Sequence, residues 1–182
     1  VPVHFFTGNH DMWDNGYLSG ELGLQVHREP VFIQAFGKVF HIGHGDGLGE
    51  KGHGYGLMKA VFSSAVSRKL FAFLHPFVGM RLAGTLSKMS RAANRKNDAV
   101  FKGEEEEWLF AYCKNVLKKK QVDFFVFGHR HLPMKLKVSE ASIYVNTGDW
   151  ITHYSYAVFE EEDIELKHFG KKGDAEPAAY SV

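Results

Sequence analysis

The fold is decided by Asp123–His131, DFFVFGHRH, in which a continuous apolar run leads directly into a polar loop. A short apolar run bounded by turn residues is typical of a buried β-strand. Gly128 lets the chain turn sharply at the end of this strand, which fixes the loop in space. His129 and His131 flank a single residue, so both imidazoles can face the same side. The stretch therefore predicts two histidines presented at the edge of a sheet.

The same form, an apolar strand followed by a glycine-bounded polar loop, recurs in FFTGNHD (5–11) and FHIGHGD (40–46). The first loop follows a strand predicted at Val3–Phe6, and the second follows a hairpin predicted at Val31–Ala35 and Lys38–Ile42. GNHD alone could be an Asx turn, and HGD alone is a weak signal. If the loops meet at one sheet edge, however, their imidazole, amide and carboxylate groups suit divalent Mn, Fe or Zn.

The rest of the chain indicates an α/β protein with one domain of ordinary globular composition. We expect helical structure from Leu57 to about Asn97, broken near Pro76 and Gly79. A further helix is expected at Glu104–Lys120, with acids in its first turn and lysines in its last. Alternating patterns predict strands at Met134–Val138, Ser142–Asn146, Tyr154–Phe159 and Ile164–His168. Helices early and hairpins late favour a sandwich with mixed β-sheets flanked by helices, and residues 171–182 should form a loose tail.

An unusual insertion lies between the second and third loops. Residues 51–97 hold nine Lys or Arg and no Asp or Glu, together with many large apolar residues. A basic and apolar stretch in helical pattern is typical of surfaces that meet anionic amphiphiles. It could also be a helical hairpin packed on the core with a solvated basic face. Nucleic-acid binding is a third interpretation, but no recognised nucleic-acid motif supports it.

The ordered set G-N-H-D, H-G-D and G-H-x-H resembles the second part of the calcineurin-like metallophosphoesterase pattern. The resemblance implies a calcineurin-like sandwich and a site for two divalent metal ions, with Mn²⁺ expected and Fe or Zn as alternatives. It implies Asn9, His44 and His129 as ligands of one metal and His131 as a ligand of the other. His10 would act as general acid or bind phosphate, and Asp11 would orient it.

The first part of that family pattern, D-x-H and then G-D-x-x-D with the metal-bridging aspartate, does not occur among these residues. We therefore expect residues 1–170 to be part of a longer metallophosphoesterase domain. Without the bridging carboxylate, His131 alone would hold the first metal. The prediction is that this stretch by itself binds metal weakly and turns over little.

Within the class, the chain resembles UDP-2,3-diacylglucosamine hydrolases of lipid A synthesis. The insertion, residues 51–100, matches the position of that family's helical lid, and Ser90, Asn94 and Lys96 match its substrate-contacting segment. The resemblance implies a UDP-linked acylated glucosamine as substrate, no nucleic acid, and a peripheral place on the cytoplasmic face of the inner membrane. Asn146–Trp150, NTGDW, also resembles this family, although a strand-end turn with Trp150 in the core is an alternative.

One position departs from the resemblance. Hydrolases of this family carry Arg at the position of His10, whereas His is common in metallophosphoesterases at large. This leaves two alternatives open: a metallophosphoesterase for another nucleotide or phospholipid diester, and a non-catalytic scaffold that keeps the fold. The resemblance predicts hydrolysis of the diphosphate of UDP-2,3-diacylglucosamine to UMP and 2,3-diacylglucosamine 1-phosphate.

Overall fold

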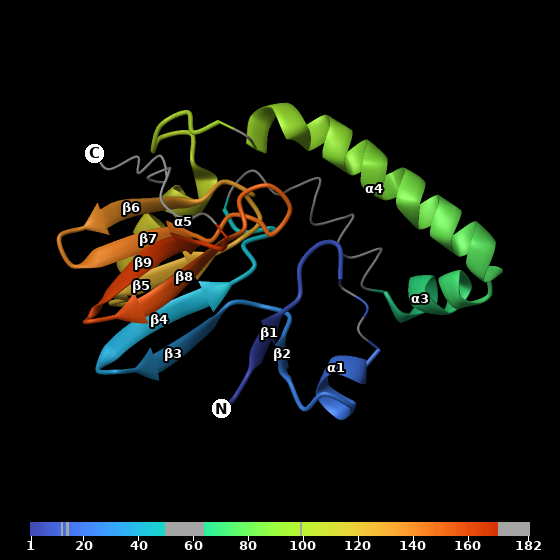
Figure 1. The fold of residues 1–182 in the computed structure, drawn as a ribbon, viewed down its shortest axis with the longest axis horizontal. Coiled ribbons are helices and arrows are strands. Elements are labelled where there is room, and N and C mark those ends of the chain that lie inside the picture. The colour runs from blue at the N-terminus through green and yellow to red at the C-terminus, as the bar shows by residue number, and fades with distance from the viewer. Residues whose placement is uncertain (12, 14, 50–63, 99, 171–182) are drawn as a thin grey trace.

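The structure, a computed structural model, describes residues 1–11, 13, 15–49, 64–98 and 100–170 (Figure 1). Its elements, in chain order, are β1 (His4–Phe6), α1 (Tyr17–Gly20), β2 (Gln25–His27), β3 (Val31–Ala35), β4 (Lys38–Gly43), α3 (Ala65–Ala72), α4 (Pro76–Asp98), α5 (Trp108–Leu117), β5 (Phe124–Phe127), β6 (Met134–Ser139), β7 (Ser142–Asn146), β8 (Ser155–Glu160) and β9 (Asp163–His168). The predicted strands are confirmed to within about a residue, while α1 and β2 were not predicted.

The centre of the fold is a five-stranded mixed sheet with the strand order β3-β4-β5-β7-β6. The strands β4, β5 and β7 are mutually parallel, whereas the outer strands β3 and β6 run antiparallel to their neighbours. Parallel neighbours end at the same edge, so the loops after β4, β5 and β7 lie together there (Figure 1). This topology explains why residues distant in sequence can share one site.

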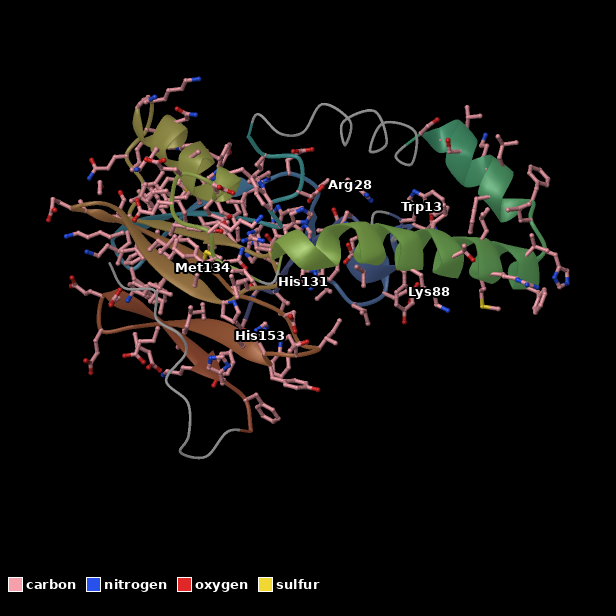
Figure 2. The ribbon with its side chains drawn as sticks, turned by 90° about the horizontal axis from the view of Figure 1, so that it is seen from above. Trp13, Arg28, Lys88, His131, Met134 and His153 are labelled. Carbon is pink, nitrogen blue, oxygen red and sulfur yellow. The ribbon has the colours of Figure 1, made fainter. Side chains whose placement is uncertain are left out.

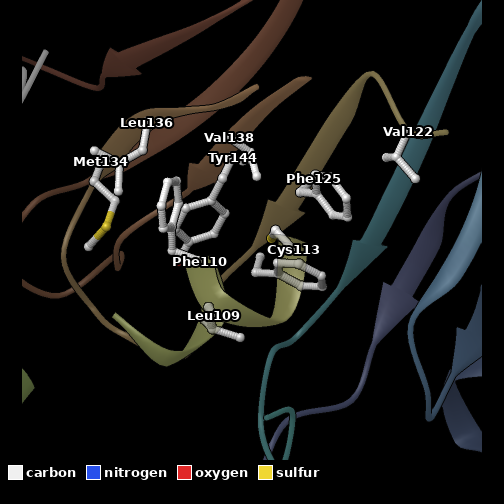
Figure 3. Packing of buried hydrophobic residues seen from close by; sticks show 10 residues of the cluster. Leu109, Phe110, Cys113, Val122, Phe125, Met134, Leu136, Val138 and Tyr144 are labelled. Atoms are coloured by element: carbon white, nitrogen blue, oxygen red, sulfur yellow. The ribbon is translucent and has the colours of Figure 1, made fainter. Parts of the chain in front are cut away.

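Helix α5 covers one face of this sheet and the β8–β9 ribbon covers the other. Leu109, Phe110 and Cys113 of α5 pack against Phe125 and Tyr144 of the sheet, and all five are fully buried (Figure 3). On the opposite face, the ribbon joins a second cluster that is built on residues of the sheet and of β9: Phe40, Phe124, Val145 and Ile164. The predicted α/β sandwich is thus confirmed.

Strand β1 pairs in parallel with β2 and forms a small separate sheet. The loop after β1 reaches the edge at which β4 and β5 end (Figure 1). Thr7 donates its N–H to the His27 carbonyl at 2.9 Å, which fixes the start of this loop against β2. The first polar loop, GNHD, is therefore brought to the same region by a separate pair of strands.

Helices α3 and α4 form an arm that extends away from the sheets (Figure 1). The Ser64 hydroxyl accepts the Val66 N–H and caps α3. The predicted break is confirmed before Pro76 but is wrong at Gly79, which lies inside α4. A Cβ on Gly79 would lie 3.3 Å from the Phe71 ring, so the glycine permits close packing of α3 on α4.

The helix expected at Glu104–Lys120 is shorter than predicted, because α5 begins at Trp108 and has no acidic residue in its first turn. Glu104 to Glu106 form a preceding turn, and Glu107 is the extended N-cap residue. The reason is that Glu107 is drawn into a buried ion pair with Arg130, described below. The tail predicted after Gly170 and the first part of the helical stretch, residues 57–63, lie outside the described residues.

Candidate active site

His44 stands at the end of β4 and is held by its own loop. Its Nδ1 lies 2.8 Å from Oδ1 of Asp46. Gly45 has a φ of 108°, which a side chain would strain, so glycine is needed for the loop to return Asp46 to His44. A carboxylate on Nδ1 fixes the ring and leaves Nε2 as the nitrogen for a ligand, the arrangement common in metal-binding histidines.

His129 follows β5 and lies beside His44, since the centroids of the two rings are 5.2 Å apart. Gly128 donates its N–H to the His44 carbonyl at 3.0 Å, which joins the two loops directly. Burial, helped by the neighbouring His44, lowers the pKa of His129 to about 4. The ring is therefore neutral near pH 7, and a neutral imidazole is the form that binds a metal.

His131 lies at the outer side of the same loop and keeps half of its side chain exposed, at 51%. Its Nδ1 is 4.0 Å from Oδ2 of Asp149. Both His129 and His131 have positive φ angles, 67° and 53°, which are uncommon for residues other than glycine. Such backbone strain is typical of functional loops and requires support from the surrounding structure.

That support comes from Arg130, which points away from the two histidines into the protein. Its Nε donates to Oε2 of Glu107 at 2.8 Å, and the two side chains are 4% and 2% exposed. Its guanidinium also lies 5.2 Å from the Trp108 ring and donates to the Val100 carbonyl at 3.3 Å. Arg130, which lies between His129 and His131 in sequence, therefore anchors their loop to the start of α5.

Asp149 is a site residue that the sequence interpretation did not single out. Its carboxylate accepts the backbone N–H of Ile151 at 2.8 Å and of His153 at 3.2 Å, and binds His153 Nδ1 at 3.1 Å. Burial opposes ionisation, but these donors and the N–H of Thr152 together lower the pKa of Asp149 to about 2. Asp149 is thus ionised near pH 7, and its Oδ2 lies 4.0 Å from His131 Nδ1 and 3.1 Å from His153 Nδ1.

Asn146, the last residue of β7, joins the loop after β5 to the loop after β7. Its Nδ2 donates to the Gly128 carbonyl and, at 3.2 Å, to the Tyr144 hydroxyl, while its Oδ1 accepts the Gly148 N–H at 3.1 Å. Asn146 is fully buried, so these hydrogen bonds satisfy a side chain that would be costly to bury alone. Asn146 of the NTGDW motif therefore helps to position the loop that carries His129 and His131.

The GNHD loop meets the His44 loop at Gly8. A Cβ on Gly8 would lie 2.5 Å from Nε2 of His44, so the glycine backbone runs against that ring. Asp11 accepts the Gly8 N–H and closes the loop. Asn9 is half-buried, whereas His10 and Asp11 are exposed. The structure places Gly8, the neighbour of Asn9, against the His44 ring, while the roles predicted for Asn9, His10 and Asp11 stay predictions.

Trp13 extends this loop to the helical arm, since its ring contacts Phe71 of α3 edge-on at 5.1 Å (Figure 2). The residues predicted to contact substrate from the arm, Ser90, Asn94 and Lys96, fall in the last part of α4. Their side chains lie outside the described residues, so these roles also stay predictions.

The alternative that placed Trp150 in the core is wrong, because its side chain is 55% exposed.

The convergence predicted for the histidines is confirmed for His44 and His129, with His131 in the same loop. Among the described residues, no group of three or more His, Cys, Asp or Glu side chains forms a complete metal site. The donors nevertheless fit a divalent cation in kind. The His129 imidazole is neutral, the His44 imidazole has its Nδ1 fixed by a carboxylate, and Gly8 of the Asn9 loop lies against the His44 ring.

Gly8→Ala tests the contact between the first and second loops. The added methyl would overlap the His44 ring. The ring cannot move away freely, because its Nδ1 is held by Asp46. We expect turnover to fall roughly 10–100-fold, the usual cost of disturbing the support of a ligand. Gly20→Ala is the matched control, because a Cβ there meets nothing within 4 Å. Wild-type kcat in Gly8→Ala would show that His44 and Gly8 are not in contact.

No family model matches the chain. The chain is similar to UDP-2,3-diacylglucosamine hydrolase of Porphyromonas gingivalis (strain W83), with 33% identity over 92% of this chain and 68% of that protein. It is also similar to proteins of the same name from Escherichia coli O127:H6 and O81, with 27% and 26% identity over 93% of this chain and 70% of each relative.

In the part of the chain that the structure describes, no helix is long and apolar enough to cross a membrane.

Proposed function

The chain belongs to the family of UDP-2,3-diacylglucosamine hydrolases, and from this premise we propose that it hydrolyses the diphosphate of UDP-2,3-diacylglucosamine. One P–O bond of the diphosphate breaks, water supplies the new oxygen, and the products are UMP and 2,3-diacylglucosamine 1-phosphate. The observation that carries the proposal is the His44–His129 pair at the edge where the parallel strands end.

A diphosphate is multiply anionic, so its hydrolysis requires positive charge near the phosphoryl oxygens. Divalent cations, with Mn²⁺ as the first candidate and Fe or Zn as alternatives, would supply that Lewis acidity when bound. The protein residues that we assign to hold them are Asn9, His44, His129 and His131. His129 is suited to this role because its burial keeps the imidazole neutral across the physiological range.

The other residues of the site bind or position groups. His10 is exposed on the first loop, so we assign it to hold a proton near the leaving phosphate. Asp149 places a negative charge 4.0 Å from His131 Nδ1, and its carboxylate stays ionised down to about pH 2. Asn146 and Arg130 position the loop that carries His129 and His131. Asn146 binds it to the end of β7, and Arg130 binds it to Glu107.

The arm formed by α3 and α4 is the part that we assign to the acyl chains. Its described residues expose large apolar side chains, among them Leu70 at 64%, Phe73 at 88% and Met80 at 70%. The described cations of the arm include Lys69, Arg81 and Lys88, and residues 51–97 hold no acid. An apolar and cationic surface of this kind suits a substrate with lipid chains and a diphosphate.

We expect the full-length enzyme to prefer UDP-2,3-diacylglucosamine over UDP-N-acetylglucosamine by at least about hundredfold in kcat/KM. Each buried methylene contributes about 0.8 kcal/mol, so three or four methylenes suffice for this ratio. The measurement is UMP release with Mn²⁺ and after chelation. Equal kcat/KM for the two substrates would refute the substrate assignment and favour another nucleotide diester.

The contribution of the arm is separated by point variants. Phe73→Ser or Met80→Ser should lower kcat/KM for the acylated substrate and leave that for UDP-N-acetylglucosamine unchanged. Phe36→Ser is the matched control, because Phe36 is 81% exposed in the β3–β4 turn, away from the arm. A preference that survives both arm substitutions would assign the acyl chains to another surface.

A further inference from the structure

A pocket lies beside the candidate site, between the end of β2 and the loop after β4. Its lining includes His27, Arg28 and Glu29 from the β2 side, and His44 and Asp46 from the β4 side. The empty space is about 220 Å³, including the open mouth. The pocket therefore shares His44 with the site that we assign to the metals.

The backbone on both sides of Arg28 is held in place. Before it, the His27 carbonyl accepts the Thr7 N–H at 2.9 Å. After it, Pro30 lies against the end of β4, where a Cβ on Gly43 would be 2.8 Å from the Pro30 Cβ. The Arg28 side chain is exposed and lies at the end of the sheets from which the arm extends (Figure 2). A ligand in the pocket can therefore reach the guanidinium without any movement of the backbone.

The charges in the lining limit what the pocket can hold. An acyl chain would desolvate a guanidinium and two carboxylates, which is costly. The guanidinium of Arg28 is a fork of N–H donors that matches two oxygens of a phosphate. Of the two carboxylates, Asp46 binds His44 at 2.8 Å, and Glu29 places a second negative charge in the lining. A carboxylate repels phosphate but accepts hydrogen bonds from hydroxyl groups, so the lining suits a phosphate ester that also carries hydroxyl groups.

Only one half of the proposed substrate has this chemistry and still needs a place. The acylated glucosamine is assigned to the arm, and none of the arm residues that the structure describes lines the pocket. The other half, UMP, combines a phosphate with the 2′- and 3′-hydroxyl groups of ribose. Its phosphate belongs to the diphosphate that is cleaved beside His44, so the ribose must lie within a few bonds of that residue.

We propose that the pocket holds the UMP half of the substrate, with Arg28 donating to its phosphate and Glu29 accepting from its ribose hydroxyl groups. The inference rests on the proposed function, because that function supplies the two halves of the substrate. Arg28 and Glu29 then determine which nucleotide the enzyme accepts, while the arm determines which lipid it accepts.

Calorimetric titration of the full-length protein with UMP in the presence of Mn²⁺ tests the role of Arg28 without turnover. Arg28→Met keeps the length of the side chain and removes the charge. The Kd for UMP should rise about 10–100-fold, the usual effect of losing a hydrogen bond to a charged group. Arg28→Lys keeps the charge without the fork and should recover part of this loss. Lys137→Met is the matched control, because Lys137 pairs with Glu140 on the exposed β6–β7 hairpin.

Glu29→Ala tests which part of the ligand the carboxylate contacts, because the two possibilities predict opposite signs. If Glu29 accepts the ribose hydroxyl groups, its loss should raise the Kd for UMP and leave that for 2′,3′-dideoxyuridine monophosphate unchanged. A lower Kd for UMP in Glu29→Ala would show that the carboxylate only repels phosphate, and it would overturn the proposal.

Two further results would also overturn the proposal. One is an unchanged Kd for UMP in Arg28→Met, and the other is tighter binding of glucosamine 1-phosphate than of UMP to the wild type, which would assign the pocket to the sugar half. UMP release from UDP-2,3-diacylglucosamine is assayed separately. Failure of that assay together with UMP binding that depends on Arg28 would refute the proposed function and leave the pocket assignment in place.

Discussion

Replacing His129 should reduce kcat by at least about a thousandfold and leave the fold nearly intact. His129 lies beside His44 with a ring separation of 5.2 Å, and its pKa of about 4 keeps the imidazole neutral. A ligand that positions a Lewis acid supplies several kcal/mol of transition-state stabilisation, and each 1.36 kcal/mol is a factor of ten in rate. The expected loss thus exceeds that of a supporting residue, which is roughly 10–100-fold.

The choice of substitution matters because His129 has a φ of 67°. Asn tolerates this left-handed conformation better than Ala, so His129→Asn removes the imidazole with little change in backbone strain. The measurements are kcat, Mn²⁺ affinity by calorimetry and the melting temperature. His4→Ala is the matched control, because His4 is exposed on β1 and outside the three loops. An unchanged kcat in His129→Asn would remove His129 from the ligand set.

Glu107→Ala should have the largest effect on stability, about 3–5 kcal/mol in the free energy of unfolding. The Glu107–Arg130 pair is almost completely buried, with an Nε–Oε2 distance of 2.8 Å. Removing one partner leaves a buried charge without its counterion, which costs far more than the pair itself contributes. For a chain of this length, the melting temperature should fall by about 10 °C.

Urea unfolding measures this loss, and Glu104→Ala is the matched control. Glu104 also pairs with a cation, Lys114, at 3.8 Å, but both side chains are exposed. An exposed pair is worth about 0.2–1 kcal/mol, so Glu104→Ala should change little. Because Arg130 lies between His129 and His131, Glu107→Ala should also lower kcat at temperatures where the variant is folded. If Glu107→Ala and Glu104→Ala lowered the free energy of unfolding by similar amounts, the buried pair would have no special role in stability.

The parts of the site that follow strands could be predicted from sequence. Two stretches carry this signal, DFFVFGHRH and FHIGHGD. In each, the apolar run predicts a buried strand and the glycine predicts the loop that follows it. The structure makes these strands parallel neighbours, and the proximity of His44 and His129 follows from that pairing. Glycine-bounded loops at strand ends are therefore reliable indicators, because local backbone freedom alone specifies them.

Features that depend on tertiary contacts could not be predicted in the same way. Asp149 gains its role from the N–H groups of a turn and from His131, which is distant in sequence. Helix α5 starts late because Glu107 is engaged by Arg130. Gly79 does not break α4, because Phe71 of the preceding helix packs where a side chain would be. In each case a contact formed on folding overrides the local preference.

The connection between two adjacent parallel strands has a consequence for how specificity can be redesigned. β4 ends at Gly43 and β5 begins at Phe124, and the whole arm lies between these two points. The cost of closing such a connection rises only slowly with its length. Whole arms could therefore be exchanged, shortened or lengthened between related enzymes while the strand pair and its two histidines stay fixed. Such grafting would let the chemistry and the choice of lipid be engineered as independent modules.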